Sequence, residues 1–170
     1  MAACGLAWWL GGCAPYPGSV PLVDAQTLRA ADRSNQLYAA VAQGADSLAR
    51  HAQGVVAVLH FPMLGAGPYD PLAEEVREIV TTRLATRPGL TLVERSQVEQ
   101  VHTEYNYLRG LENWDDDAAA RAGRELGASL VALGAIVPVG ASGVRVHMRI
   151  VHVVSRRLEA AHVTPVLMRP

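Results

Sequence analysis

Lysine is absent from this 170-residue chain, and cysteine is nearly so. The 15 positively charged residues are all arginine, and 16 acidic residues bring the formal net charge to -1, so no overall field attracts nucleic acid. The two cysteines, Cys4 and Cys13, lie near the N-terminus, which excludes a disulfide within the rest of the chain. This length fits one domain with a hydrophobic core and a short N-terminal appendage.

Motifs for catalysis, metals and cofactors are also missing. The chain has no Gly-x-Ser-x-Gly elbow, no P-loop and no His-Glu-x-x-His sequence, and its six histidines form no cluster with zinc-ligand spacing. The loop Gly65–Gly67 follows an expected strand and precedes an expected helix, but it lacks the lysine and the third glycine of phosphate-binding motifs. We expect no enzyme, no cofactor and no metal; anion binding at Gly65–Gly67 is the alternative.

Residues 1–12 are uncharged and mostly apolar, and they end in small residues before Cys13. A membrane span needs about 20 residues, so this run is typical of a cleavable export signal instead. Leu10-Gly11-Gly12-Cys13 resembles the bacterial lipobox, which implies that Cys13 becomes the acylated first residue. The first basic residue is only Arg29, so a hydrophobic leader with a chance cysteine is the alternative. Prolines in residues 13–22 favour a stiff, extended tether.

Hydrophobic periodicity divides the rest of the chain into helices and strands. Residues 23–53 predict an N-terminal helical segment of one or two helices, with a possible break at Gly44. For residues 54–170 we expect an α/β (α+β) domain, with a mixed sheet of about five strands, a C-terminal antiparallel meander and helices packed on the sheet. The expected strands are 54–61, 90–94, 128–139, 144–154 and 158–167, and the expected helices are 71–87, 96–108 and 118–126.

Local patterns predict where the helices of this domain begin and what they expose. Asp70 followed by Pro71 is typical of an N-cap with proline in the first turn. The run 96–99 matches a capping box, and the acidic run Asp115–Asp117 suits the positive end of a helix dipole. In the helix at 71–87 the apolar stripe leaves Arg77 among the residues expected to face outward.

Three runs of sequence carry a family resemblance, at 55–61, 92–104 and 123–134. The first is an apolar strand that ends in phenylalanine, the second joins a strand to a helix through Glu94-Arg95, and the third is a helix-to-strand turn. Over roughly residues 54–168 they resemble a family of bacterial envelope proteins that includes CsgG, FlgO and LpoB, the activator of a penicillin-binding protein. FlgO is the nearest in size and layout. The chain lacks room for the long membrane hairpins of CsgG, so we expect no pore.

One group of candidate partner-binding residues belongs to the second of these runs and the segment after it. Glu94 and Arg95 lie at a strand end, where they either bind a partner or fix the turn with a salt bridge. Glu104 is placed to meet Arg95 or Arg109, or it is a surface charge of the helix. Trp114 is an aromatic residue of the kind that anchors interfaces.

A second group lies on the strand expected at 144–154. Alternation puts its apolar residues on one face and Arg145, His147 and Arg149 on the other. This polar row is a docking stripe for an acidic partner, or alternatively a solvated face of the sheet.

These features predict a non-enzymatic lipoprotein that faces the periplasm from the outer membrane. Ala14 after Cys13 suits outer-membrane sorting, and the resemblance implies an assembly or stabilisation factor for a flagellum or another envelope machine. The alternative is an activator of a peptidoglycan synthase, against which the short tether argues. A small ligand-binding or nucleotide-binding α/β domain is the third hypothesis. The expected partners are envelope proteins, the membrane through the lipid anchor and a possible second copy of the chain, with no nucleic acid.

Overall fold

The computed structural model describes residues 25–66, 70–109, 116–140 and 143–167. Cys13 and Trp114 lie outside the described residues. The elements are α1 (Ala25–Leu48), β1 (Gly54–Val58), α2 (Pro71–Ala85), β2 (Leu90–Leu92), α3 (Arg95–Arg109), α4 (Asp116–Glu125), β3 (Leu130–Val139), β4 (Gly143–His152) and β5 (Leu158–Leu167). No helix in these ranges is both long and apolar enough to cross a membrane.

The strands form one mixed sheet in the order β2-β1-β3-β4-β5. β1 pairs in parallel with β2 and β3, and β3, β4 and β5 follow as an antiparallel meander. β1 is an interior strand covered on both faces, which explains why its residues Val56, Ala57 and Val58 are all apolar and buried. The expected fold class, a mixed sheet with a C-terminal meander and packed helices, is confirmed.

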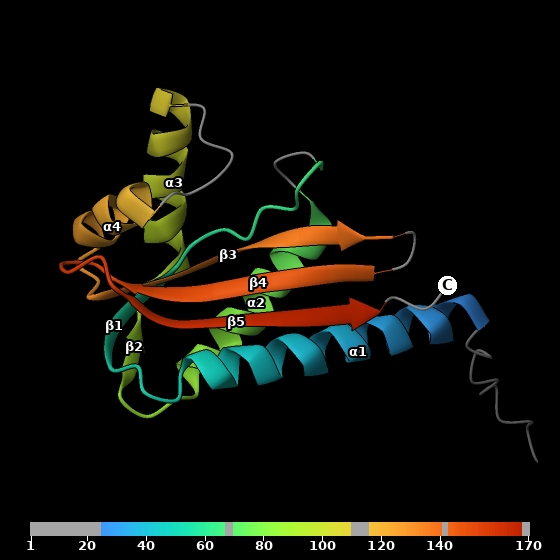
Figure 1. The fold of residues 1–170 in the computed structure, drawn as a ribbon. Coiled ribbons are helices and arrows are strands. Elements are labelled where there is room, and N and C mark those ends of the chain that lie inside the picture. The colour runs from blue at the N-terminus through green and yellow to red at the C-terminus, as the bar shows by residue number, and fades with distance from the viewer. Residues whose placement is uncertain (1–24, 67–69, 110–115, 141–142, 168–170) are drawn as a thin grey trace, which may run out of the picture.

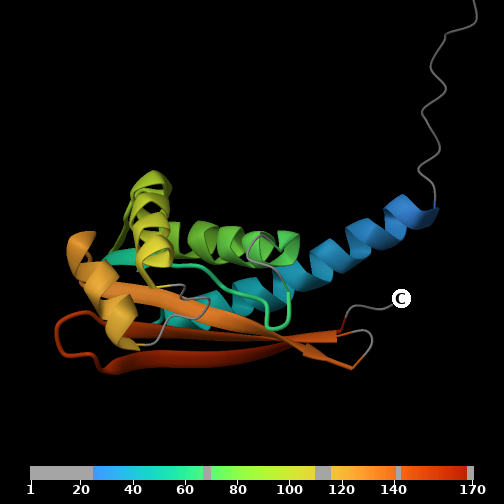
Figure 2. The same cartoon turned by 90° about the horizontal axis from the view of Figure 1, so that it is seen from above.

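Helices cover both faces of the sheet, as Figure 1 shows. α1 and α2 pack on one face and form a hydrophobic core with the strand residues Val58, Ala132 and Ile150. α3 and α4 pack on the other face, where Ala57 and Val131 are in a second core. Neighbouring residues of one strand therefore enter different cores, as the two-residue period of a strand requires. Figure 2 shows that the first turns of α1 project beyond the strands.

α1 runs without a break through Gly44, so the expected interruption there is wrong. Gly44 is buried against the sheet, and a Cβ at this position would collide with the methyl group of Met148 and lie 2.9 Å from the ring of His162. Glycine is therefore needed for the close approach of α1 to β4 and β5, and the neighbouring turns keep the helix continuous. Leu37, Val41 and the rest of this helix face contribute to the core of the domain.

The helix starts agree with the sequence in two cases and differ in one. Asp70 caps α2, since its Oδ1 accepts hydrogen bonds from the backbone N–H groups of Leu72 at 2.9 Å and Ala73 at 3.3 Å. α4 begins at Asp116, with acidic residues in its first turn as expected. α3 begins at Arg95, so the capping box at 96–99 is wrong.

At the start of α3 the carbonyl of Glu94 accepts the backbone N–H groups of Gln97 at 3.1 Å and Val98 at 3.3 Å. The strands β1 and β2 are also shorter than expected, ending at Val58 and Leu92. Beyond Val58 the backbone continues beside β3, with hydrogen bonds from the N–H of Leu59 to the carbonyl of Ala132 and from the N–H of Leu64 to the carbonyl of Ile136, both at 2.9 Å. This continuation covers the edge of β3.

Candidate functional site

α3 and α4 cover only one end of their side of the sheet. In Figure 1 both helices gather where β3 begins, whereas the far ends of β3, β4 and β5 extend beyond them toward the end where α1 begins. The side of these far ends that points away from α1 is not covered by any helix of the described chain. We call this surface the open face; its residues are Val137, Val139, Arg145, His147, Val163 and Pro165.

The open face combines apolar and basic side chains in register. Arg145 of β4 lies between Val137 of β3 and Pro165 of β5, and His147 lies beside Val163 in the next row. Arg145 is exposed, and Val163 keeps 48% of its surface exposed. On the opposite side of β4, the alternate residues Val144, Val146, Met148 and Ile150 are buried. The expected alternation along this strand is thus confirmed, and Arg145 and His147 lie on one continuous surface.

Arg149 belongs to the boundary of the open face. Its Nη2 pairs with the Oδ1 of Asp116 at 2.9 Å, which ties β4 to the start of α4. Arg145, in contrast, pairs with no acidic side chain of the described residues. An unpaired guanidinium beside exposed valines is available to a partner that carries a carboxylate.

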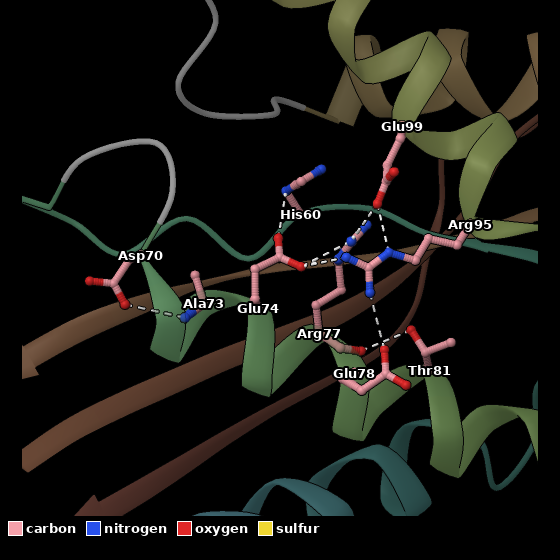
Figure 3. Close-up of polar contacts among 9 residues, drawn as sticks. All are labelled: His60, Asp70, Ala73, Glu74, Arg77, Glu78, Thr81, Arg95 and Glu99. Carbon is pink, nitrogen blue, oxygen red and sulfur yellow. Dashed lines mark hydrogen bonds and ion pairs between the residues drawn. The ribbon is translucent and has the colours of Figure 1, made fainter.

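Arg95 joins a charged network between α2 and α3, shown in Figure 3. Its guanidinium donates hydrogen bonds to Glu99 at 2.6 Å, Glu74 at 2.9 Å and Glu78 at 3.3 Å. The hydrogen bond that Arg95 donates to Glu99 raises the pKa of Arg95, and the same bond, together with the one donated by Arg77, lowers the pKa of Glu99. Arg95 therefore bridges α2 and α3 within the fold, and its role in binding a partner stays a prediction.

Arg77 lies beneath this network and is only 3% exposed, so its expected outward position is wrong. It donates to Glu74 at 3.0 Å and to Glu99 at 3.1 Å (Figure 3). The helical pattern of α2 alone could not reveal this, because α3 provides the covering side chains. A buried arginine flanked by two carboxylates is a structural ion-pair cluster.

Two histidines lie beside the same network and were not distinguished by the sequence. His60, just after β1, stacks on His102 of α3 with ring centroids 3.7 Å apart. Burial, followed by the nearby charges of His102 and Arg77, lowers the pKa of His60 to about 4. Burial also lowers the pKa of His102, so both rings are neutral at pH 7. The two histidines are 42 residues apart along the chain and belong to no sequence motif, so the sequence could not indicate that they are in contact.

The structure does not show how the remaining predicted site residues could contact a partner. Glu94 is exposed and contributes its carbonyl to the start of α3. The side chain of Glu104 lies outside the described residues, as do Cys13, Trp114 and Gly67. Within the described ranges, no three His, Cys, Asp or Glu side chains are grouped to hold a metal ion. The open face is therefore the candidate functional site.

Three solved structures share this fold. The LpoB C-terminal domain from Salmonella enterica matches with a TM-score of 0.63 and 16% identity, covering 77% of this chain and 98% of that one. The LpoB C-terminal domain from Escherichia coli matches with a TM-score of 0.58 and 17% identity, covering 76% of this chain and 97% of that one.

The NMR structure of E. coli LpoB matches with a TM-score of 0.55 and 15% identity, covering 97% of this chain and 81% of that one. No protein-family model and no curated protein sequence matches the chain. The described domain therefore has the fold of the LpoB C-terminal domain. None of the three structures is of a FlgO or flagellar protein, and the expected FlgO type stays a prediction.

Proposed function

We propose that this chain is an outer-membrane lipoprotein, anchored at Cys13, whose domain faces the periplasm and activates a peptidoglycan synthase by binding it. The fold carries this proposal, because the match extends over 98% of the LpoB domain from Salmonella enterica. The resemblance of the sequence to a family that includes the penicillin-binding-protein activator LpoB supports the same role. The domain catalyses no reaction itself in this account.

The open face is the proposed docking surface for the synthase. Val139 and Val163, 45% and 48% exposed, supply apolar area that a partner would remove from water. Arg145 supplies a positive charge that attracts and orients an acidic partner surface. Arginine is also enriched among residues that dominate binding energy at interfaces. The partner surface should therefore combine a carboxylate with an apolar patch.

The short tether limits where the synthase can be met. Residues 13–22, if fully extended, reach about 30 Å. α1 begins at the same end of the sheet as the open face (Figure 1), so the chain that leads from the proposed anchor joins the described domain at this end. The synthase must therefore present its docking surface close to the outer membrane.

In-cell cross-linking followed by affinity purification and mass spectrometry tests this function. The native chain should recover a peptidoglycan synthase, and Cys13→Ser, which removes the proposed anchor, should lose it. Arg145→Glu should reduce recovery, whereas Arg33→Glu on the exposed start of α1 should not. Recovery of flagellar basal-body proteins in place of a synthase would contradict the activator role and support flagellar assembly.

A further inference from the structure

A cavity of about 620 Å³ lies on the α1 side of the sheet, away from the open face. It is bordered by the last turns of α1, the turn that follows α2 and the middle of β5. Its polar lining consists of Gln43, Asp46, Ser47, Arg50, Arg87 and His162. Cavities of roughly 300–1,000 Å³ are typical of small-molecule sites.

Asp46, the acidic residue of this lining, is already paired twice. Both oxygens of its carboxylate are engaged by Arg83, with Nε of that arginine at 3.0 Å from Oδ1. Arg87 pairs with the same carboxylate at 2.6 Å. The hydrogen bond from Arg83 is the main cause that lowers the pKa of Asp46, which keeps the carboxylate ionised and occupied. Asp46 is thus unable to neutralise a further cation.

Arg50 is a positively charged residue of the same lining that Asp46 does not neutralise. It follows the end of α1, is exposed, and pairs with no acidic side chain of the described chain. Its backbone N–H bonds to the carbonyl of Ser47 at 3.5 Å, which holds the chain in a turn beside the cavity. The guanidinium groups of Arg50, Arg83 and Arg87 outnumber the one carboxylate of Asp46, so these groups in and beside the cavity carry a net positive charge.

The wall of the cavity is held in place by the close packing of α1. Because Gly44 has no side chain, α1 approaches the ring of His162 closely, and that ring lines the cavity. Gln43 and Ser47, one turn apart on α1, add an amide and a hydroxyl that donate and accept hydrogen bonds. The lining therefore combines neutral hydrogen-bonding groups with an uncompensated guanidinium.

We infer that this cavity binds a small ligand that carries carboxylate or phosphate groups. The planar guanidinium of Arg50 matches such oxyanions with two parallel hydrogen bonds, and the neutral groups receive the remainder of the ligand. The excess positive charge favours an anion over a neutral or cationic ligand of the same size. This inference is independent of the peptidoglycan-synthase role.

Backbone-amide NMR titration of the full-length chain tests it, with inorganic phosphate and citrate as separate probes. We expect saturable shifts confined to residues around 43–50, 87–88 and 162, and the probe with the lower Kd identifies the preferred oxyanion. Arg50→Glu should weaken binding roughly tenfold or more, since a charge-assisted hydrogen bond is replaced by repulsion. Arg33→Glu, on the exposed start of the same helix, should leave the Kd unchanged.

Two results would overturn the inference. One is the absence of saturation with both probes up to about 10 mM, which would place both Kd values above that concentration. The other is an equal Kd for the native chain and Arg50→Glu, because binding would then not use the proposed group. If Arg50→Glu does not fold, Arg50→Gln removes the charge without reversing it and is read in the same way.

Discussion

The buried guanidinium of Arg77 on α2 donates a hydrogen bond to the carboxylate of Glu99 on α3 at 3.1 Å. This contact joins helices that cover opposite faces of the sheet, because α2 belongs to one core and α3 to the other. Figure 3 shows both residues within the charged network where α2 and α3 approach each other. The pair therefore holds the position of α3, and with it the end of the sheet that bounds the open face.

Arg77→Met should lower the free energy of unfolding by about 1–3 kcal/mol. Methionine retains the apolar stem of the side chain but loses the hydrogen bonds to Glu74 and Glu99. The loss is limited because both carboxylates are partly exposed and keep Arg95 as a partner. Urea unfolding followed by circular dichroism at pH 7.5 measures the change.

The control for this variant is Glu78→Gln, which removes an exposed carboxylate that pairs with Arg95 in the same network. Exposed ion pairs contribute less than about 1 kcal/mol, so the control should stay near the native value. Equal stability of Arg77→Met and the native chain would contradict the structural role of the buried pair.

Stability should fall as the pH drops from about 6.5 toward 4. His60 is neutral in the folded protein because burial, His102 and Arg77 lower its pKa to about 4, while Glu74 and Glu99 oppose this shift only in part. In the unfolded chain this histidine binds a proton near pH 6.5, whereas in the folded chain it stays neutral until about pH 4. Protonation therefore favours the unfolded chain in this interval, and the free energy of unfolding decreases. The expected loss is about 3 kcal/mol when the interval is complete.

His60→Gln tests this pH dependence. The variant should have a flatter dependence of the free energy of unfolding on pH between 7.5 and 4.5, measured by urea unfolding. His51→Gln, at an exposed histidine just after α1, should keep the native slope. A native slope in His60→Gln would show that another group causes the pH dependence.

Gly134→Ala should destabilise the domain by about 3 kcal/mol or more, through overpacking. A Cβ at Gly134 would collide with the carbonyl of His147 on β4 and lie 2.6 Å from the ring of Phe61, the only phenylalanine of the chain. Thermal unfolding checks the effect, with Ala135→Ser as the control on the opposite side of β3. A melting temperature of Gly134→Ala equal to the native one would contradict the packing of Phe61 on this strand.

Cys13→Ser should abolish incorporation of labelled palmitate and release the chain from the membrane fraction. The lipobox at residues 10–13 predicts acylation at this position only, so Cys4→Ser should retain both the label and the membrane association. Metabolic labelling and cell fractionation provide the two readouts. Labelling that survives in Cys13→Ser would contradict the proposed anchor.

Local signals in the sequence account for most of the fold. The Asp70-Pro71 pair, the apolar run of β1 and the valine-rich meander each predict an element without knowledge of its neighbours, and all three are confirmed. The burial of Arg77 could not be predicted, because it depends on α3 lying beside α2. The continuous path of α1 through Gly44 was equally hidden, since it follows from the approach of Met148 on β4.

The candidate site was predictable only in part. The two-residue period of β4 places Arg145 and His147 on one side, and the structure confirms this. The extent of the open face depends on where α3 and α4 end over the sheet, which strand periodicity does not contain. The ion pair of Arg149 with Asp116 likewise joins segments that are separate in the sequence, so Arg149 could not be distinguished from its neighbours.

A polymerisation assay is the most direct test of whether the open face binds and activates a peptidoglycan synthase. A purified synthase from the same bacterium would be incubated with its lipid-linked substrate, alone or with the native chain, Arg145→Glu or Arg33→Glu. We expect the native chain and Arg33→Glu to increase the rate of glycan synthesis, and Arg145→Glu, although folded, to increase it much less. An unchanged rate with the native chain, or equal stimulation by Arg145→Glu, would contradict this role of the open face.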